Sequence, residues 1–270
     1  MSDFSLDKYK RLFDLSGRVA LVIGGGSGIG QAAAYGLAAH GARCVVADLA
    51  AGNAEITAAN IRAGGGSAEA FAVDVTSTAE VDALVAKVVE RCGRIDVLLT
   101  TPARNLRKRL VNYSDEEFDS VINLNLKGTF RVARAVGKQM MQQKNGSIIL
   151  MSSIRAYSVE PGQSIYASTK SGIGQMTKGL ATELADYGIR VNAVAPGIIA
   201  TPLTAPITSN PEWNRAYAER TALGRWAHAD ELAGPIVFLA SDASSYLTAT
   251  VIAVDAGWTG IDGRYKPPVS

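Results

Sequence analysis

Residues that build metal centres and disulfides are scarce in this sequence. Its 270 residues include two cysteines, Cys44 and Cys92, without a CxxC pair, and two histidines, His40 and His228. So few ligands exclude a His/Cys metal cluster, and we therefore expect no metal site. The unpaired cysteines favour a reducing compartment over a disulfide-stabilised secreted fold.

Long apolar runs and an excess of one charge are missing as well. The N-terminal stretch MSDFSLDKYKRLFDLSG is charged and interrupted, and no run approaches the roughly 20 apolar residues of a membrane span. The 27 lysines and arginines against 25 aspartates and glutamates leave a net charge of +2, too small to indicate nucleic acid or anionic membrane as a partner. We expect a cytoplasmic protein with a small-molecule substrate.

Short apolar segments rich in β-branched residues are plentiful. Helix-length segments that are Ala-rich or amphipathic separate them. Strands that are apolar nearly throughout are typical of a parallel sheet covered by helices on both faces. The sequence therefore predicts one α/β domain over residues 1–270 with a doubly wound parallel sheet. Its seven predicted strands are 18–23, 42–47, 67–73, 95–100, 146–152, 189–195 and 250–254.

Ligands of such sheets bind beyond the carboxyl ends of the strands, so the segments that follow the strands carry most information. The longest irregular one, residues 196–225, follows the sixth predicted strand and contains one short helical piece. Excursions of this length in a compact domain are usually lids or binding loops. We therefore expect this segment to close over the substrate.

A glycine-rich turn, GGGSGIG at Gly24–Gly30, follows the first predicted strand and precedes a helix. Such a turn lets backbone N–H groups approach a pyrophosphate. Asp48 ends the second strand, where a carboxylate can accept both hydroxyls of an adenosine ribose, although a loop-capping aspartate is the simpler alternative. A 2′-phosphate there would meet a like charge, and Ser27 is not a basic residue that offsets it. NAD is therefore favoured over NADP.

Tyr166 and Lys170, in YASTK, are four residues apart and would share one helix face. Pairs of this kind also occur on solvated faces. If the ammonium lies about 4 Å from the phenol, it favours the phenolate by roughly 4 kcal/mol, or about three pKa units. We therefore expect Lys170 to lower the pKa of Tyr166 toward neutrality, where a general base works best.

The glycine-rich turn, the Asn of NLNLKGTF, the Ser of ILMSS, the YASTK pair and PGIIAT together resemble the short-chain dehydrogenase/reductase family, in order and spacing, from about Leu15 to Trp258. The resemblance implies a Rossmann-type fold, a nicotinamide cofactor and a homotetramer. The family's catalytic residues fall on Asn125, Ser153, Tyr166 and Lys170, with Ser153 preferred to Ser152 for its distance to the tyrosine. The implied cofactor-binding residues are Gly24, Ser27, Gly28, Ile29, Gly30, Asp48, Asp74, Val75, Tyr166, Lys170, Pro196, Gly197, Ile199 and Thr201.

Three positions depart from the family's usual motifs. Ile23 stands where threonine is usual before the first glycine, and DAG at 255–257 replaces DGG. The third departure, TTPA at 100–103 in place of NNAG, removes amides that stabilise the central strands and line the cofactor cleft. The hydroxyls of Thr100 and Thr101 are candidates to replace part of that network.

Arginines gather near the expected mouth of the pocket, and Arg104, Arg107 and Arg155 are candidates to hold an anionic substrate. A solvated loop face is the alternative for each. The stretch from Gly224 to Leu247, followed by VDAGW, resembles most the branch with gluconate 5-dehydrogenase and 2-deoxygluconate 3-dehydrogenase. The expected function is NAD-dependent interconversion of a secondary alcohol and a ketone on a sugar acid, sugar or polyol.

Two other functions remain open. The same tetrad would serve a 3-ketoacyl-thioester reductase, against which Asp48 argues mildly because such reductases usually prefer NADPH. A non-catalytic nucleotide-sensing or nucleic-acid-binding protein is the alternative of another class; LRKRL at 106–110 lacks the interleaved aromatic residues of a base-stacking surface. The polar tail, residues 259–270, is either disordered or reaches a neighbouring subunit.

Overall fold

The computed structural model describes residues 5–262, and its core is a parallel sheet of seven strands in the order β3-β2-β1-β4-β5-β6-β9. All neighbouring strands of this sheet run parallel. The predicted doubly wound sheet and its seven strands are confirmed. The strands are β1 (Val19–Ile23), β2 (Arg43–Asp48), β3 (Ser67–Ala72), β4 (Val97–Thr100), β5 (Gly146–Met151), β6 (Ile189–Pro196) and β9 (Val251–Val254).

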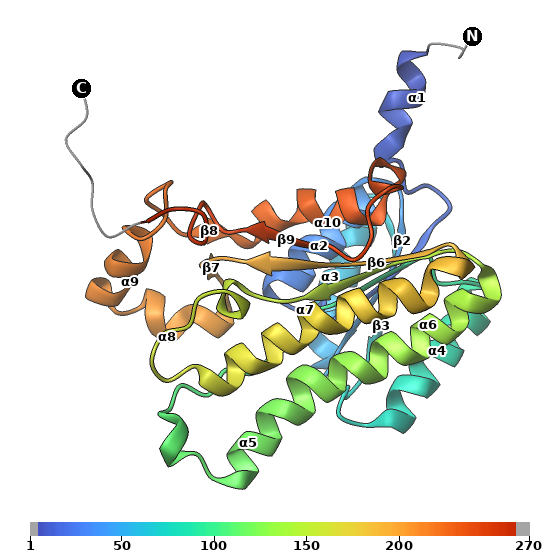
Figure 1. Cartoon of the computed structure of the whole chain (residues 1–270). Helices are drawn as coiled ribbons and strands as arrows, with labels where there is room; N and C mark the ends of the chain where they lie inside the picture. Colours follow the sequence, from blue (N-terminus) through green and yellow to red (C-terminus); the bar gives the residue numbers. More distant parts are fainter. Residues whose placement is uncertain (1–4, 263–270) are drawn as a thin grey trace.

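Helices cover both faces of the sheet (Figure 1). One layer contains α2 (Gly28–Ala39), α3 (Ala51–Ala63) and α10 (Ala233–Ala240), and the other contains α4 (Thr78–Cys92), α6 (Thr129–Gln143) and α7 (Ser164–Leu184). The short helix α5 (Asp115–Ile122) packs beside α7, and α1 (Leu6–Lys10) projects from the opposite end of the molecule (Figure 1). This arrangement leaves the carboxyl ends of the strands open between the layers.

The apolar pattern of β1 shows why both faces need cover. Leu21 and Ile23 pack in the core under α4, α6 and α7, whereas Ala20 and Val22 pack in the core under α2, α3 and α10. Alternate residues of a strand point to opposite faces, so a strand buried on both faces is apolar along its whole length. The continuous apolar runs in the sequence therefore indicate that helices cover both faces of the sheet.

The segment predicted as a lid, residues 196–225, lies beyond the carboxyl end of β6 (Figure 1). It contains β7 (Ile199–Ala200), α8 (Ala205–Thr208) and α9 (Pro211–Ala218), and β7 pairs in parallel with β8 (Ala227–His228). A separate small apolar core holds the segment: Ile154, Ile198, Ile207, Tyr217 and Trp258, with Trp213 and Trp226 against them. The tail beyond residue 262 lies outside the described residues.

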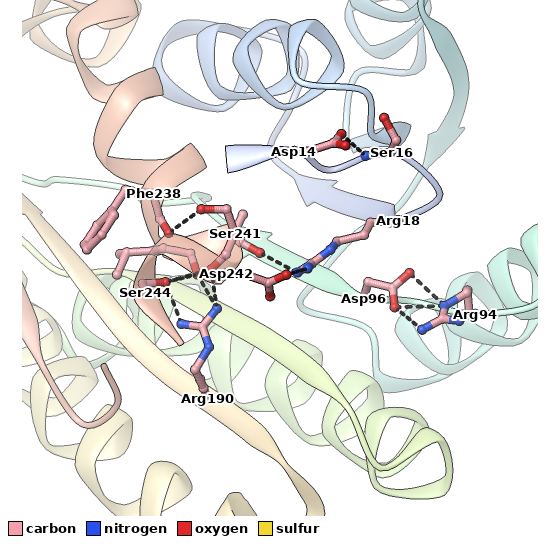
Figure 2. A network of polar contacts seen from close by, with 12 residues as sticks. Asp14, Ser16, Arg18, Arg94, Asp96, Arg190, Phe238, Ser241, Asp242 and Ser244 are labelled. Atoms are coloured by element: carbon pink, nitrogen blue, oxygen red, sulfur yellow. Dashed lines mark hydrogen bonds and ion pairs between the residues drawn. The ribbon is translucent and has the colours of Figure 1, made fainter. Parts of the chain in front are cut away.

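At the amino ends of the strands, a polar network joins separate elements (Figure 2). Asp96, just before β4, accepts a 2.9 Å hydrogen bond from the Val19 N–H and pairs with Arg94. Arg190 of β6 donates to the carbonyls of Leu239 and Ser241 and to Ser244. These bonds satisfy buried backbone groups at the edge opposite the glycine-rich turn, so we assign this edge to stability.

Asp96→Ala should destabilise the protein by about 2–3 kcal/mol, because the buried Val19 N–H loses its acceptor and Arg94 loses its partner. Asp242→Ala at the same edge is the control: its side chain is 63% exposed, against 1% for Asp96, and its ion pair with Arg18 should contribute less than about 1 kcal/mol. Urea unfolding followed by circular dichroism measures both losses. Equal losses would contradict the assignment.

Candidate active site

The glycine-rich turn connects β1 to α2 at the carboxyl edge of the sheet. Gly24 has φ +78°, in the left-handed region that favours glycine. A Cβ on Gly30 would lie 2.1 Å from the Gly24 carbonyl oxygen, so only glycine fits there. The Gly26 N–H donates to Asp48 Oδ2 at 3.0 Å, which ties the turn to the end of β2. Asp48 also accepts from the Ala50 N–H at 3.0 Å, so its carboxylate is fixed beside the turn.

Thr101, one of the two threonines proposed from the sequence to replace part of the missing amide network, contacts the same turn. Its hydroxyl lies 3.1 Å from the carbonyl oxygen of Ile23 and 3.2 Å from that of Gly24, within donating distance of either. Thr101 therefore replaces part of the amide network expected from NNAG. The neighbouring Pro102 and Ala103 line the same cleft.

A cleft of about 350 Å³ opens at the carboxyl ends of the strands. All fourteen residues predicted to bind the cofactor line it: Gly24, Ser27, Gly28, Ile29, Gly30, Asp48, Asp74, Val75, Tyr166, Lys170, Pro196, Gly197, Ile199 and Thr201. Ser153 lines it as well. Sequence reasoning missed other lining residues. Leu49, Val73 and Ser152 follow strand ends, Leu124 lies in the helical turn between α5 and α6, and Pro202, Leu203 and Thr204 belong to the segment 196–225.

Tyr166 and Lys170 lie one turn apart on α7, and both side chains are buried. The Lys170 Nζ lies 5.6 Å from the centroid of the Tyr166 ring and donates to the Met151 carbonyl at 2.8 Å. Ser152 donates to the Lys170 carbonyl, whereas Ser153 faces the cleft with the tyrosine. The end of β5 and the helix α7 thus bring three of the four predicted catalytic residues together.

The prediction that neighbouring groups of the protein lower the pKa of Tyr166 is wrong. Burial raises the pKa of the phenol, and the Ser153 hydrogen bond and the positive charge of Arg155 offset this only in part. Burial also lowers the pKa of Lys170 to about 7. Both shifts have one cause, because removal from water disfavours the charged form of each group. The simple distance argument left this desolvation out.

Asn125 stands in a single π-helical turn, Asn123–Gly128, between α5 and α6. Its Oδ1 accepts from the Arg104 N–H at 2.8 Å, and its Nδ2 donates to the Arg104 carbonyl at 2.9 Å and to Thr169 at 3.2 Å. Asn125 is fully buried and does not line the cleft. Asn125 thus connects the loop after β4 to Thr169 of α7, the residue that precedes Lys170 in the sequence.

The three arginines predicted to bind substrate do not line the cleft. The backbone of Arg104 holds Asn125, and its side chain is exposed. Arg107 and Arg155 both pair with one carboxylate, that of Glu160. Among the residues from 5 to 262, no group of histidine, cysteine, aspartate and glutamate could hold a metal ion, and none of the helices is long and apolar enough to cross a membrane.

This fold and cleft define an α/β protein of the dinucleotide-binding type, and comparisons with known proteins agree. A family model described as enoyl-(acyl carrier protein) reductase matches residues 24–259. The chain is 41% identical over 244 residues, 90% of this chain and 98% of the relative, to a 3-oxoacyl-[acyl-carrier-protein] reductase of Thermotoga maritima. It is 34% identical over 248 residues, 92% and 97% of the two chains, to gluconate 5-dehydrogenase of Gluconobacter oxydans.

A solved structure of similar fold is that of a gluconate 5-dehydrogenase from Burkholderia cenocepacia in complex with NADP and tartrate. It has a TM-score of 0.90 and 34% identity, and the match covers 93% of this chain and 98% of that one. The chain belongs to the short-chain dehydrogenase/reductase family, and the resemblance inferred from five motifs is confirmed. It is an oxidoreductase of that family, with sugar-acid dehydrogenases and ketoacyl reductases among its relatives.

Lys170 should make stability depend on pH. The unfolded chain holds the Lys170 proton up to a pKa near 10.5, whereas the folded chain releases it at about 7. The folded state therefore gains stability as pH rises from about 7 toward 10, and loses it as pH falls through 7. Lys170→Met should remove this component, so the melting temperature should rise less between pH 7 and 9 in the variant than in the wild type. Parallel curves would show that Lys170 titrates normally.

Proposed function

We propose that the chain is an NAD-dependent dehydrogenase that interconverts a secondary alcohol and a ketone on a sugar acid, sugar or polyol. One observation carries the proposal: a single cleft is lined by the glycine-rich turn, by Asp48, and by Ser153, Tyr166 and Lys170. A cofactor-binding surface and a set of proton-transfer groups therefore face the same space. The glycines, which keep side chains away from this surface, fit the pyrophosphate of a dinucleotide.

A bound nicotinamide cofactor accepts or supplies the hydride. In the oxidative direction, Tyr166 removes the hydroxyl proton of the substrate, and Ser153 donates a hydrogen bond to the oxygen on which negative charge develops. Lys170, when protonated, favours the phenolate electrostatically, and it would hold the ribose of a bound nicotinamide cofactor. Asn125 positions the pair on α7 by tying the loop after β4 to Thr169.

The substrate class rests on relatives as well as on the cleft. Sugar-acid dehydrogenases match the chain over more than nine-tenths of its length, which supports a polyhydroxylated substrate. The 41% identity to a 3-oxoacyl-[acyl-carrier-protein] reductase favours a second candidate, the reduction of a 3-ketoacyl thioester. Turnover of polyols or aldonates, set against turnover of an acetoacetyl thioester, separates the two.

Asp48 supports NAD over NADP. Lys170 is the one lysine or arginine among the described residues that line the cleft, so no second cation there offsets Asp48 beside a 2′-phosphate. The relative from Burkholderia cenocepacia, in contrast, was crystallised with NADP. The cofactor preference therefore needs its own measurement.

We also propose a cytoplasmic homotetramer, with residues 196–225 as the substrate lid. The family supports the assembly, and exposed Phe118 on α5 and Phe130 on α6 supply apolar surface for it. Leu203 and Thr204 of the proposed lid line the cleft. Light scattering measures the assembly. Salt-sensitive retention of nucleic acid during purification would instead support the non-catalytic alternative.

Tyr166→Phe tests the catalytic assignment. The variant lacks the proton acceptor but keeps the ring, so kcat should fall by about 10²–10⁴-fold while cofactor affinity stays within about twofold. Initial rates of reduced-nicotinamide formation and a fluorescence titration measure the two quantities. Tyr246→Phe is the control, since Tyr246 is fully exposed and does not line the cleft. A Tyr166→Phe variant with near wild-type kcat would refute the role.

Asp48→Ser tests the cofactor preference. Wild-type kcat/KM should be higher with NAD⁺ than with NADP⁺, and loss of the carboxylate should lower that ratio by about tenfold or more, because the like charge facing the 2′-phosphate is removed. Asp74→Asn, on the adenine side of the same cleft, should change both cofactors alike. A wild type that prefers NADP⁺ would overturn the NAD proposal and leave the hydride-transfer proposal standing.

A further inference from the structure

Four polar side chains outside the cleft meet at a single carboxylate, that of Glu160. Glu160 Oε1 accepts hydrogen bonds from Arg107 Nη1, Gln163 Nε2 and the Tyr217 hydroxyl, and Arg155 Nη2 lies 3.2 Å from it. Both guanidinium groups also donate to the Tyr217 hydroxyl at 3.2 Å. We call these residues, Arg107, Arg155, Glu160, Gln163 and Tyr217, the Glu160 cluster.

The cluster borders the catalytic end of the cleft. Arg107 follows β4, Arg155 and Glu160 follow β5, and Tyr217 belongs to α9 of the proposed lid. The Arg155 N–H donates to Ser153 Oγ at 3.1 Å, which connects the cluster to a residue that lines the cleft. A substrate that reaches Ser153 and Tyr166 from the lid side therefore passes close to this cluster.

The two guanidinium groups are held rigidly. Arg107 lies 4.7 Å over the Trp213 ring, and Arg155 lies 5.3 Å over the Trp258 ring. The side chain of Arg155 is only 8% exposed, and those of Arg107 and Glu160 are 27% and 23% exposed. Two positioned, partly buried arginines form a strong carboxylate site, because the guanidinium fork matches a carboxylate and low hydration strengthens the attraction.

Glu160 already supplies the carboxylate that such a site would bind. A second carboxylate approaching the same arginines would meet the Glu160 charge at short range and would find those donors engaged. Glu160 lies seven residues after Ser153 in a loop, with no motif to mark it, and the sequence therefore indicated only the arginines.

We infer that Glu160 is a specificity-determining residue, whose carboxylate occupies the Arg107–Arg155 pair and so selects uncharged polyols and sugars over sugar acids. The inference rests on the proposed function and narrows its substrate class. It assigns the arginines to the protein's own carboxylate in the wild type. Removing that carboxylate should turn the pair into a site for an anionic substrate.

Glu160→Gln is the test, because it removes the charge and keeps the size of the side chain. Calorimetry with the NAD⁺-loaded protein compares gluconate with uncharged glucitol. The wild type should bind gluconate no better than glucitol, and Glu160→Gln should bind gluconate at least tenfold more tightly than the wild type. Turnover, where it is detected, should shift toward gluconate in the same ratio. Unchanged gluconate affinity in a folded Glu160→Gln protein would overturn the inference.

Two further variants keep the test specific. The double variant Arg107→Met/Glu160→Gln should lose most of the gain, since one guanidinium is gone. Glu117→Gln removes one negative charge, as Glu160→Gln does, but from the neighbouring ion pair with Lys108. It should leave gluconate binding unchanged. A similar gain in Glu117→Gln would mean that overall charge, rather than the Glu160 cluster, controls affinity.

Arg107→Met alone decides the matter even if Glu160→Gln does not fold, which a melting curve shows. If Glu160 occupies Arg107, this variant should not weaken gluconate binding relative to the wild type. If the wild type instead binds gluconate tightly and Arg107→Met loses that binding, Arg107 binds the substrate and the inference is refuted. Calorimetry measures binding without turnover and so tests the role of Glu160 by itself. Absence of activity on every polyol, sugar and aldonate would contradict the proposed function and not the binding result.

Discussion

A parallel sheet that is buried on both faces imposes the main constraint on this protein. Parallel strands need crossover connections, and these bring all the carboxyl ends to one edge, where loop backbone and polar side chains line a cleft. The glycine-rich turn, Asp48, Asp74, Ser153 and the segment after β6 all lie at this edge. The opposite edge carries the network of Asp96 and Arg190, which joins strands and lines no part of the cleft.

Desolvation controls the chemistry of the groups gathered there. The α7 helix places Tyr166 and Lys170 in the sheet-facing layer, where burial makes both ionised forms costly. A phenol and an amine that are each held near neutral charge respond strongly to any charge brought into the cleft, because the local dielectric is low. The Met151 carbonyl fixes the lysine and keeps the two groups close. The pair is thus positioned by the fold, and its protonation depends on what the cleft contains.

Most of this architecture could be predicted from the sequence, for identifiable reasons. Continuous apolar strands, the glycine-rich turn and the residues after strand ends follow from local patterns, and each of them lies where those patterns placed it. The direction of the pKa shift of Tyr166 could not be predicted, because helical spacing gives the distance between two side chains and not their burial. Glu160 was missed for a similar reason, since a loop carboxylate has no periodicity and its partners come from three separate segments.

The Glu160 cluster shows why an arginine count alone is a weak guide to substrate charge. Arg107 and Arg155 carry two positive charges near the catalytic end, but the fold supplies a carboxylate on the chain between Ser153 and Tyr166. The anchor formed by Trp213, Tyr217 and Trp258 prevents the guanidinium groups from turning elsewhere. An ion pair held this firmly has already lost its conformational entropy, so a substrate carboxylate gains little by competing for it. In this geometry, selectivity depends on the acidic residue that the chain provides as much as on the arginines themselves.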